Sequence, residues 1–185
     1  MEETQQIQRT LLQTNKMEYS INFKKQLLIY FIVFISVVLL DQITKRTLIH
    51  EIGLNNTKEF VPGIINFSIV KNTGGAFSIF KEYPVCFMII GIINVFIFLY
   101  LTFCPTVPFN TITKVGCACI LGGTLGNLID RLLAGGVIDF LDLQLFNFAV
   151  FNLADVSIDI GVVLILIGWF VSRKRDTSLR GSPED

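Results

Sequence analysis

Residues 121–161 read LGGTLGNLIDRLLAGGVIDFLDLQLFNFAVFNLADVSIDIG and place five aspartates in or between two apolar segments. A charged side chain at membrane depth costs several kcal/mol unless it is paired or hydrated. The acids therefore indicate catalysis or ion handling. They are Asp130, Asp139, Asp142, Asp155 and Asp159.

The composition of the whole chain is that of an integral membrane protein. Of its 185 residues, 52% are hydrophobic and seventeen are Phe, and the mean hydropathy is +0.62. Fifteen basic and fifteen acidic residues give no net charge, so no cationic surface for nucleic acid is expected. We interpret the four cysteines as apolar packing residues without a disulfide or metal. They are Cys86, Cys104, Cys117 and Cys119.

Four apolar segments are long enough to cross a bilayer as helices, at about 1.5 Å per residue. Lys24 and Lys25 precede the first one as in a secretory signal, but no small-residue cleavage site follows, so we predict a retained helix. Pro105 and Pro108 end the second. The predicted spans are about 27–49, 85–104, 112–133 and 153–171.

Four spans put both termini on one side of the membrane. Basic residues near the span ends fall mostly on that side, which predicts that both termini are cytoplasmic. Residues 1–23 have no apolar period and are expected to form a flexible cytoplasmic extension. We assign residues 24–172 to the membrane domain and residues 173–185 to a cytoplasmic tail.

The two extracytoplasmic segments, residues 50–83 and 134–152, contain β-favouring sequence. NFSIVK at 66–71 is followed by a turn signal at 72–75, and in VIDFLDL at 137–143 Val137, Asp139 and Leu141 share one face of an extended chain. We predict a small extracytoplasmic sheet lying on the membrane surface. Three polar clusters then meet at the outer leaflet: Asp41 with Lys45, residues 127–131, and residues 152–155.

Carboxylates are the chemical groups that this chain supplies in number. His50 is the single histidine and there is no HExxH motif, so we expect no metal and no cofactor. Two aspartates that share a partly dehydrated site cannot both ionise easily, and the pair then holds one proton near neutral pH. One member can activate water while the other polarises a carbonyl.

Each acid also has a structural interpretation. For Asp130 we favour an ion pair with Arg131 over catalysis, and Asp41 and Lys45, one turn apart, can neutralise each other. Asp142 fits a solvated loop charge, and Asp159 fits control of water access one turn below Asp155. Glycines at helix-packing spacing indicate close helix contacts. These glycines are Gly122, Gly123 and Gly126.

Five motifs in this order resemble those of bacterial lipoprotein signal peptidases, also called signal peptidase II. The resemblance covers roughly Leu27–Val171, and five ordered motifs are far more specific than one short pattern. Gly75 stands where that family usually has Ala, which is expected to loosen the turn slightly. The motifs are DQITK at 41–45, NTGGAFSIF at 72–80, GNLIDR at 126–131, GGVIDF at 135–140 and FNLAD at 151–155.

The resemblance implies a membrane aspartyl endopeptidase of the bacterial inner membrane, with its site near the outer face. Its substrates would be diacylglyceryl-modified prolipoproteins, cut just before the lipidated cysteine. Its other partner would be membrane lipid. We expect the protein to be a monomer. The catalytic pair would be Asp139 and Asp155. The residues lining the site would be Asn72, Asn127, Arg131 and Asn152, and those supporting it Asp130, Asp41 and Lys45.

Two other classes of protein use intramembrane acids. A small proton-coupled transporter or channel would relay protons through them, although no inverted repeat is visible in the sequence. A structural or chaperone-like membrane protein would only pair them with Arg131 and Lys45. In that case Asp139 would tolerate replacement by Ala.

Overall fold

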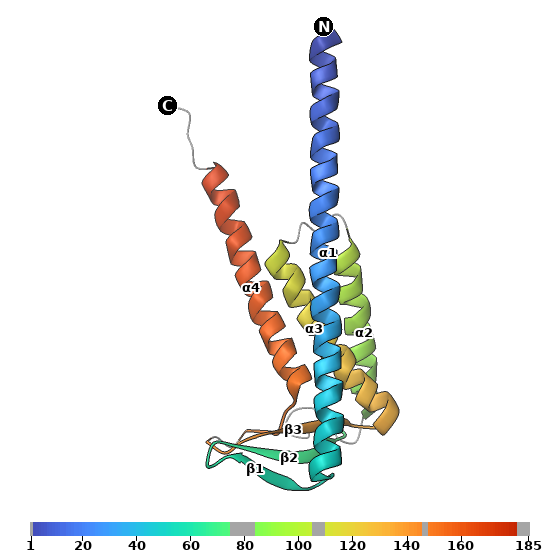
Figure 1. Ribbon diagram of the computed structural model, residues 1–185, viewed down its shortest axis with the longest axis vertical. Coiled ribbons are helices and arrows are strands. Elements are labelled where there is room, and N and C mark those ends of the chain that lie inside the picture. The colour runs from blue at the N-terminus through green and yellow to red at the C-terminus, as the bar shows by residue number, and fades with distance from the viewer. Residues whose placement is uncertain (1, 75–83, 105–109, 146–147, 181–185) are drawn as a thin grey trace.

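The computed structural model describes residues 2–74, 84–104, 110–145 and 148–180. Within these ranges the predicted fold class is confirmed, because four membrane helices carry a small antiparallel sheet at one end (Figure 1). The elements are α1 (Glu2–Ile52), β1 (Thr57–Val61), β2 (Ile65–Asn72), α2 (Pro84–Phe103), α3 (Thr111–Ala134), β3 (Val137–Leu143) and α4 (Leu153–Arg180).

Each helix contains a segment that is long and apolar enough to cross a membrane. These segments are Ser20–Ile52, Val85–Phe103, Thr111–Ala134 and Leu153–Lys174, close to the predicted spans. Gly135 ends α3 in the left-handed region at φ 69°, a backbone conformation that glycine adopts readily. Gly75, Pro105 and Pro108 lie outside the described residues, as does the end of the predicted tail, residues 181–185.

The N-terminal residues continue the first membrane helix. We expected residues 1–23 to form a flexible extension, but α1 begins at Glu2 and runs unbroken for 51 residues. The reason is that residues 2–52 contain no Gly or Pro, while Gln, Glu, Lys and Leu favour helix. Such a helix is about 75 Å long, and its N-terminal part extends beyond the other helices (Figure 1).

Helix α3 is the central element of the bundle and packs against the other three helices. In the apolar segment of α3 that could span the membrane, 72% of the residues are buried. The share is 17% or less in the corresponding segments of α1, α2 and α4. Tyr30 of α1 and Cys117, Ala118 and Leu121 of α3 form the core between the helices. The three outer helices therefore direct most of their large apolar side chains outward, as membrane helices do.

Glycines let α3 approach its neighbours closely, as the sequence predicted. A Cβ atom on Gly122 would lie 2.9 Å from the Val37 Cβ of α1. A Cβ atom on Gly123 would lie 2.9 Å from the Ile158 Cγ1 of α4 and would clash with the Ala154 carbonyl oxygen. No side chain fits at either contact without movement of the helices.

The sheet joins the two segments that separate the helices at this end. Its strands are antiparallel in the order β1-β2-β3, so β3, which follows α3, pairs with β2, which follows α1. In the β2–β3 register Val70 is opposite Asp139. Ile69, Ile138 and Phe140 pack under the sheet against the last turns of α1. This packing holds β3 over the ends of the helices.

The glycine contacts predict an unequal response to added methyl groups. Gly123→Ala should lower the free energy of unfolding in detergent by about 1–3 kcal/mol, because overpacking displaces α4 from α3. Gly91→Ala on α2 is the control, since its Cβ would lie 3.5 Å from the Leu128 Cδ1, an ordinary contact. Thermal unfolding measures both variants, and equal melting temperatures would contradict this account of α3–α4 packing.

Candidate active site

Asn152 and Asp155 start α4 by capping each other. The Asn152 Oδ1 accepts a hydrogen bond from the Asp155 backbone N–H at 3.0 Å, and the Asp155 Oδ2 accepts one from the Asn152 backbone N–H at 3.2 Å. This reciprocal pair is a capping box. It fixes the Asp155 carboxylate at the N-terminus of α4, where the helix dipole favours negative charge.

Asp139 lies on β3 with 3% of its surface exposed. Its Oδ1 accepts a hydrogen bond from the Asn152 Nδ2 at 2.6 Å, and its Oδ2 accepts one from the Asn72 Nδ2 at 3.0 Å. The Asn72 Oδ1 in turn accepts from the Gly74 backbone N–H at 2.9 Å, which fixes the orientation of that amide. Two side-chain amides therefore hold the Asp139 carboxyl group.

Asn127 connects α3 to the same pair of acids. Its Nδ2 donates to the Asp155 Oδ1 at 2.8 Å, and its Oδ1 accepts from the Asn152 Nδ2 at 3.1 Å. Asn152 thus contacts Asp139 through its side chain and Asp155 through its backbone and side chain. The two carboxyl groups, 16 residues apart in the sequence, share one neighbour.

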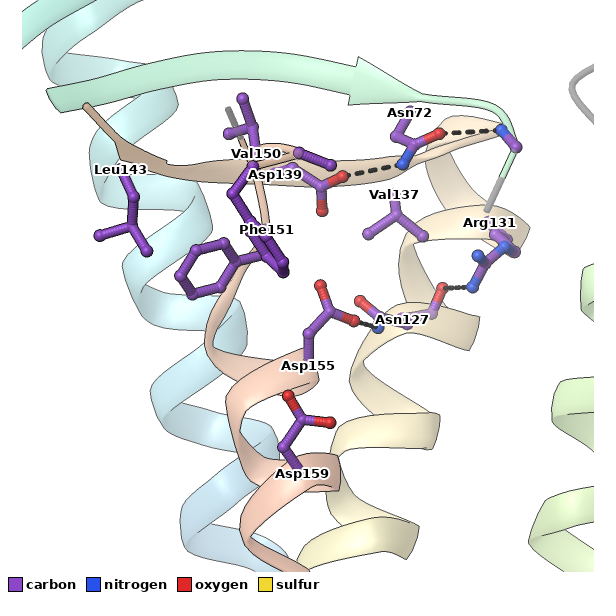
Figure 2. A pocket seen from close by; sticks show the side chains of 13 residues that line it. Asn72, Asn127, Arg131, Val137, Asp139, Leu143, Val150, Phe151, Asp155 and Asp159 are labelled. Carbon is purple, nitrogen blue, oxygen red and sulfur yellow. Dashed lines mark hydrogen bonds between the residues drawn. The ribbon is translucent and has the colours of Figure 1, made fainter. Parts of the chain in front are cut away.

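Asp139 and Asp155 line one cavity of about 500 Å³ beneath the sheet. Figure 2 shows Asp139 at the sheet end and Asp155 below it on α4, both directed into this space. The volume is sufficient for a short peptide segment. The remaining lining residues include Asn72, Asn127, Arg131, Val137, Leu143, Phe148, Val150, Phe151 and Asp159.

The environment of Asp139 favours its protonated form. Burial, assisted by the negative charge of Asp155, raises the pKa of this carboxyl from 3.8 to about 6, although the amides of Asn72 and Asn152 oppose the shift in part. A carboxyl group with this pKa can carry a proton close to neutral pH. It can then donate that proton to an oxygen atom in the cavity.

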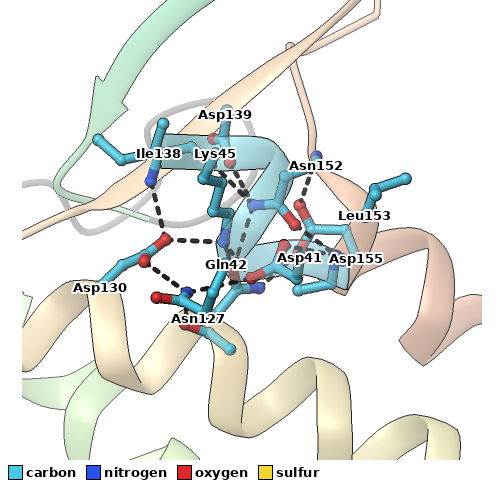
Figure 3. Close-up of polar contacts among 12 residues, drawn as sticks. Asp41, Gln42, Lys45, Asn127, Asp130, Ile138, Asp139, Asn152, Leu153 and Asp155 are labelled. Atoms are coloured by element: carbon cyan, nitrogen blue, oxygen red, sulfur yellow. Dashed lines mark hydrogen bonds and ion pairs between the residues drawn. The ribbon is translucent and has the colours of Figure 1, made fainter. Parts of the chain in front are cut away.

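A buried lysine lies behind the cavity wall (Figure 3). Lys45 has 2% of its side-chain surface exposed, and its Nζ lies 2.8 Å from the Asp41 Oδ2 and 2.7 Å from the Asp130 Oδ2. It also donates to the Asn127 Oδ1 at 3.1 Å. An ammonium group has three protons to donate, so each one has an acceptor.

The two acids that neutralise Lys45 also bind the backbone of α4 and β3, the elements that carry Asp155 and Asp139. Asp41 Oδ1 accepts a hydrogen bond from the Ala154 N–H in the first turn of α4 at 3.1 Å. Asp130 Oδ2 accepts one from the Ile138 N–H of β3 at 3.2 Å. The starts of β3 and α4 are therefore both attached to carboxylates of the lysine cluster.

The predicted ion pair of Asp130 with Arg131 is wrong. Asp130 pairs with Lys45, because consecutive residues of a helix point in different directions. Arg131 lines the cavity instead, donates to the Asn127 carbonyl oxygen at 3.3 Å and lies over the Phe87 ring at 5.4 Å.

Gln42 is a site residue that the sequence reasoning missed. Its Nε2 donates to the Asp130 Oδ1 at 2.9 Å and to the Gly126 carbonyl oxygen at 3.2 Å. The signal that could have found it is a polar amide inside an apolar span, next to Asp41. The structure brings the other predicted site residues together: Asn72, Asn127, Arg131, Asp139, Asn152 and Asp155 around the cavity, and Asp41, Lys45 and Asp130 behind it.

Fold and site together define a four-helix membrane protein with a polar, acid-containing cavity at the sheet end of its bundle. A family model for signal peptidase (SPase) II matches residues 33–171. The lipoprotein signal peptidase of Lactobacillus johnsonii is 35% identical over 147 residues, which cover 79% of this chain and 95% of that protein. That of Nostoc punctiforme is 44% identical over 133 residues, 71% of this chain and 82% of that one.

Two solved structures have the same fold. One, a bacterial membrane enzyme determined by the in meso method at 2.3 Å resolution, matches with a TM-score of 0.71 and 31% identity over 84% of this chain and 93% of that chain. A second bacterial membrane enzyme, at 1.9 Å, matches with a TM-score of 0.67 and 33% identity over 75% and 90%. The chain belongs to the signal peptidase II family of membrane proteases.

The lysine cluster predicts a large cost for loss of its cation. Lys45→Met should lower the free energy of unfolding by about 3–5 kcal/mol, because two buried carboxylates lose their counter-ion. The control is Lys58→Met on β1, where the side chain is exposed and little change is expected. Urea or thermal unfolding in detergent measures the difference. A similar stability for both variants would contradict the assigned role.

Proposed function

We propose that this protein is an aspartyl endopeptidase that removes the signal peptide from diacylglyceryl-modified prolipoproteins, cutting just before the lipidated cysteine. The family supports the substrate class, since its curated members are lipoprotein signal peptidases. The observation that carries the reaction type is the pair of carboxyl groups, Asp139 and Asp155, in one cavity with Asn152 between them. The hydrolysis needs no metal or cofactor.

The surroundings of the two acids suggest different roles. Asp155 accepts two hydrogen bonds at the N-terminus of α4, and both the donors and the helix dipole favour its carboxylate. Asp139 is more deeply buried on β3, has a pKa of about 6 and is assigned the shared proton. Asp155 is therefore assigned as the general base and Asp139 as the general acid.

The reaction then follows in two steps. Asp155 removes a proton from water as the water oxygen attacks the scissile carbonyl carbon, and Asp139 gives its proton to the carbonyl oxygen. In the resulting tetrahedral diol, Asp155 passes its proton to the leaving nitrogen while Asp139 recovers one from a hydroxyl group. The C–N bond breaks, both acids return to their initial states, and no covalent enzyme intermediate forms.

The position of the acids fits a substrate in the membrane. The signal segment is an apolar helix, and its lipid anchor lies at the outer leaflet, so the acids must lie at the depth of the scissile bond. The start of α1 and the end of α4 lie at the end of the bundle away from the sheet, or beyond it (Figure 1). We propose that both are cytoplasmic, that the sheet lies on the outer membrane surface, and that a monomer is active.

The proposed pair predicts a complete loss of processing in either isosteric variant. Asp139→Asn and Asp155→Asn should each lower kcat by at least about 10³-fold, because an amide can neither accept nor return the proton. Asp142→Asn is the matched control on β3; Asp142 bonds to Ser68 and should leave activity near that of the wild type. Cleavage of a diacylated precursor in the presence of EDTA measures all four proteins.

Activity should also depend on pH in a defined direction. Asp139 must be protonated to act as the acid, so kcat/KM should fall as pH rises through the pKa of this carboxyl, about 6, or through a higher apparent value for the coupled pair. At the acid end, protonation of the base should reduce kcat/KM again. A flat profile between pH 5 and about 9 would contradict the shared proton.

A further inference from the structure

Asp159 is an acid of the cavity that neither the reaction nor the support network uses. It lies on α4 one turn after Asp155, lines the same cavity and is exposed to it (Figure 2). Asp41, Asp130, Asp139 and Asp155 each accept hydrogen bonds from the protein. In the described part of the chain, by contrast, no N–H or O–H donor contacts the Asp159 carboxylate.

An unpaired carboxylate at this place becomes costly when a bound substrate displaces water from the cavity. Its neighbours on α4, Ile160, Val162 and Val163, are exposed apolar side chains of a membrane span. An acid at such a depth requires hydration or a donor. Because Asp159 faces the cavity, a donor on the bound substrate would meet it there.

The chemistry of the substrate limits what that donor can be. A diacylglyceryl group on a cysteine has ester and thioether atoms, which accept hydrogen bonds but do not donate them. The donor must therefore belong to the peptide. Near the scissile bond the signal segment has to leave its helix to expose the carbonyl group, so its polar groups need partners within the cavity.

Helix geometry gives the approximate position of the donor. Four residues of α4 separate Asp159 from Asp155 by about 6 Å along the helix axis, and an extended peptide rises about 3.3 Å per residue. Asp159 lies on the side of Asp155 away from the sheet (Figure 2). It therefore lies near the peptide about two residues before the cleaved bond.

We propose that Asp159 is a specificity-determining residue that accepts a hydrogen bond from a Ser or Thr side chain of the signal peptide, about two residues before the cleaved bond. The inference rests on the proposed peptidase function. It predicts that the enzyme prefers a hydroxyl over a methyl group at that position.

Matched precursors test this specificity. Lipidated precursors carry Thr or the isosteric Val at one, two or three residues before the cleaved bond, and kcat and KM are measured for wild type, Asp159→Ala, Asp159→Asn and the control Ile160→Ala. At one of these positions wild type and Ile160→Ala should prefer Thr about tenfold in kcat/KM. Asp159→Ala should lose the preference with an unchanged pH profile, and Asp159→Asn should keep part of it.

Two results would overturn the inference: no preference for Thr in the wild type at any of the three positions, or an undiminished preference in Asp159→Ala. Failure of the wild type to cleave any lipidated precursor would instead refute the proposed function itself. The isosteric Asn variant keeps the test valid if Asp159→Ala is unstable, because an amide in the same volume removes the charge without leaving a cavity.

Discussion

The ammonium group of Lys45 is the interaction on which the geometry of the site depends. It is buried between α1 and α3 and directs its three protons to Asp41, Asp130 and Asn127. These acceptors hold two elements of the cavity: Asp41 and Asn127 bond to the first turn of α4, through the Ala154 N–H and the Asp155 side chain, and Asp130 bonds to the first residues of β3. One cation thus positions two elements that are not adjacent to it in sequence.

The same arrangement gives Lys45 ion-pair partners other than Asp139 and Asp155. A salt bridge from Lys45 to Asp139 would lower the pKa of that carboxyl and favour loss of its proton. Lys45 pairs with Asp41 and Asp130 instead. Asp139 accepts hydrogen bonds from the neutral amides of Asn72 and Asn152, and burial raises its pKa to about 6. Buried ion pairs are weak evidence for stability. Here the cluster contributes position, because its carboxylates hold the starts of α4 and β3 beside the cavity.

The sequence could predict the spans and the meeting of three polar clusters, because both follow from apolar length and from the bias of basic residues. It could not distinguish Asp130 from Asp139 as a reactive acid, and only the resemblance to a family made that choice. The sequence could not predict that β2 pairs with β3, because the two segments lie about 70 residues apart in the chain. The extended α1 was missed because its polar N-terminal part has no apolar period.

Asn152 shows why the pair needs an amide between its members. One Asn side chain offers an acceptor and two donor protons. The acceptor is used by the Asp155 backbone N–H, which starts α4, and the donors reach the Asp139 carboxylate and the Asn127 oxygen. An Asp at this position would cap the helix equally well, but it would place a further negative charge between the two acids and leave Asp139 without its shortest hydrogen bond. The same side chain therefore caps α4 and binds the carboxyl group of Asp139. These two contacts couple the start of α4 to β3.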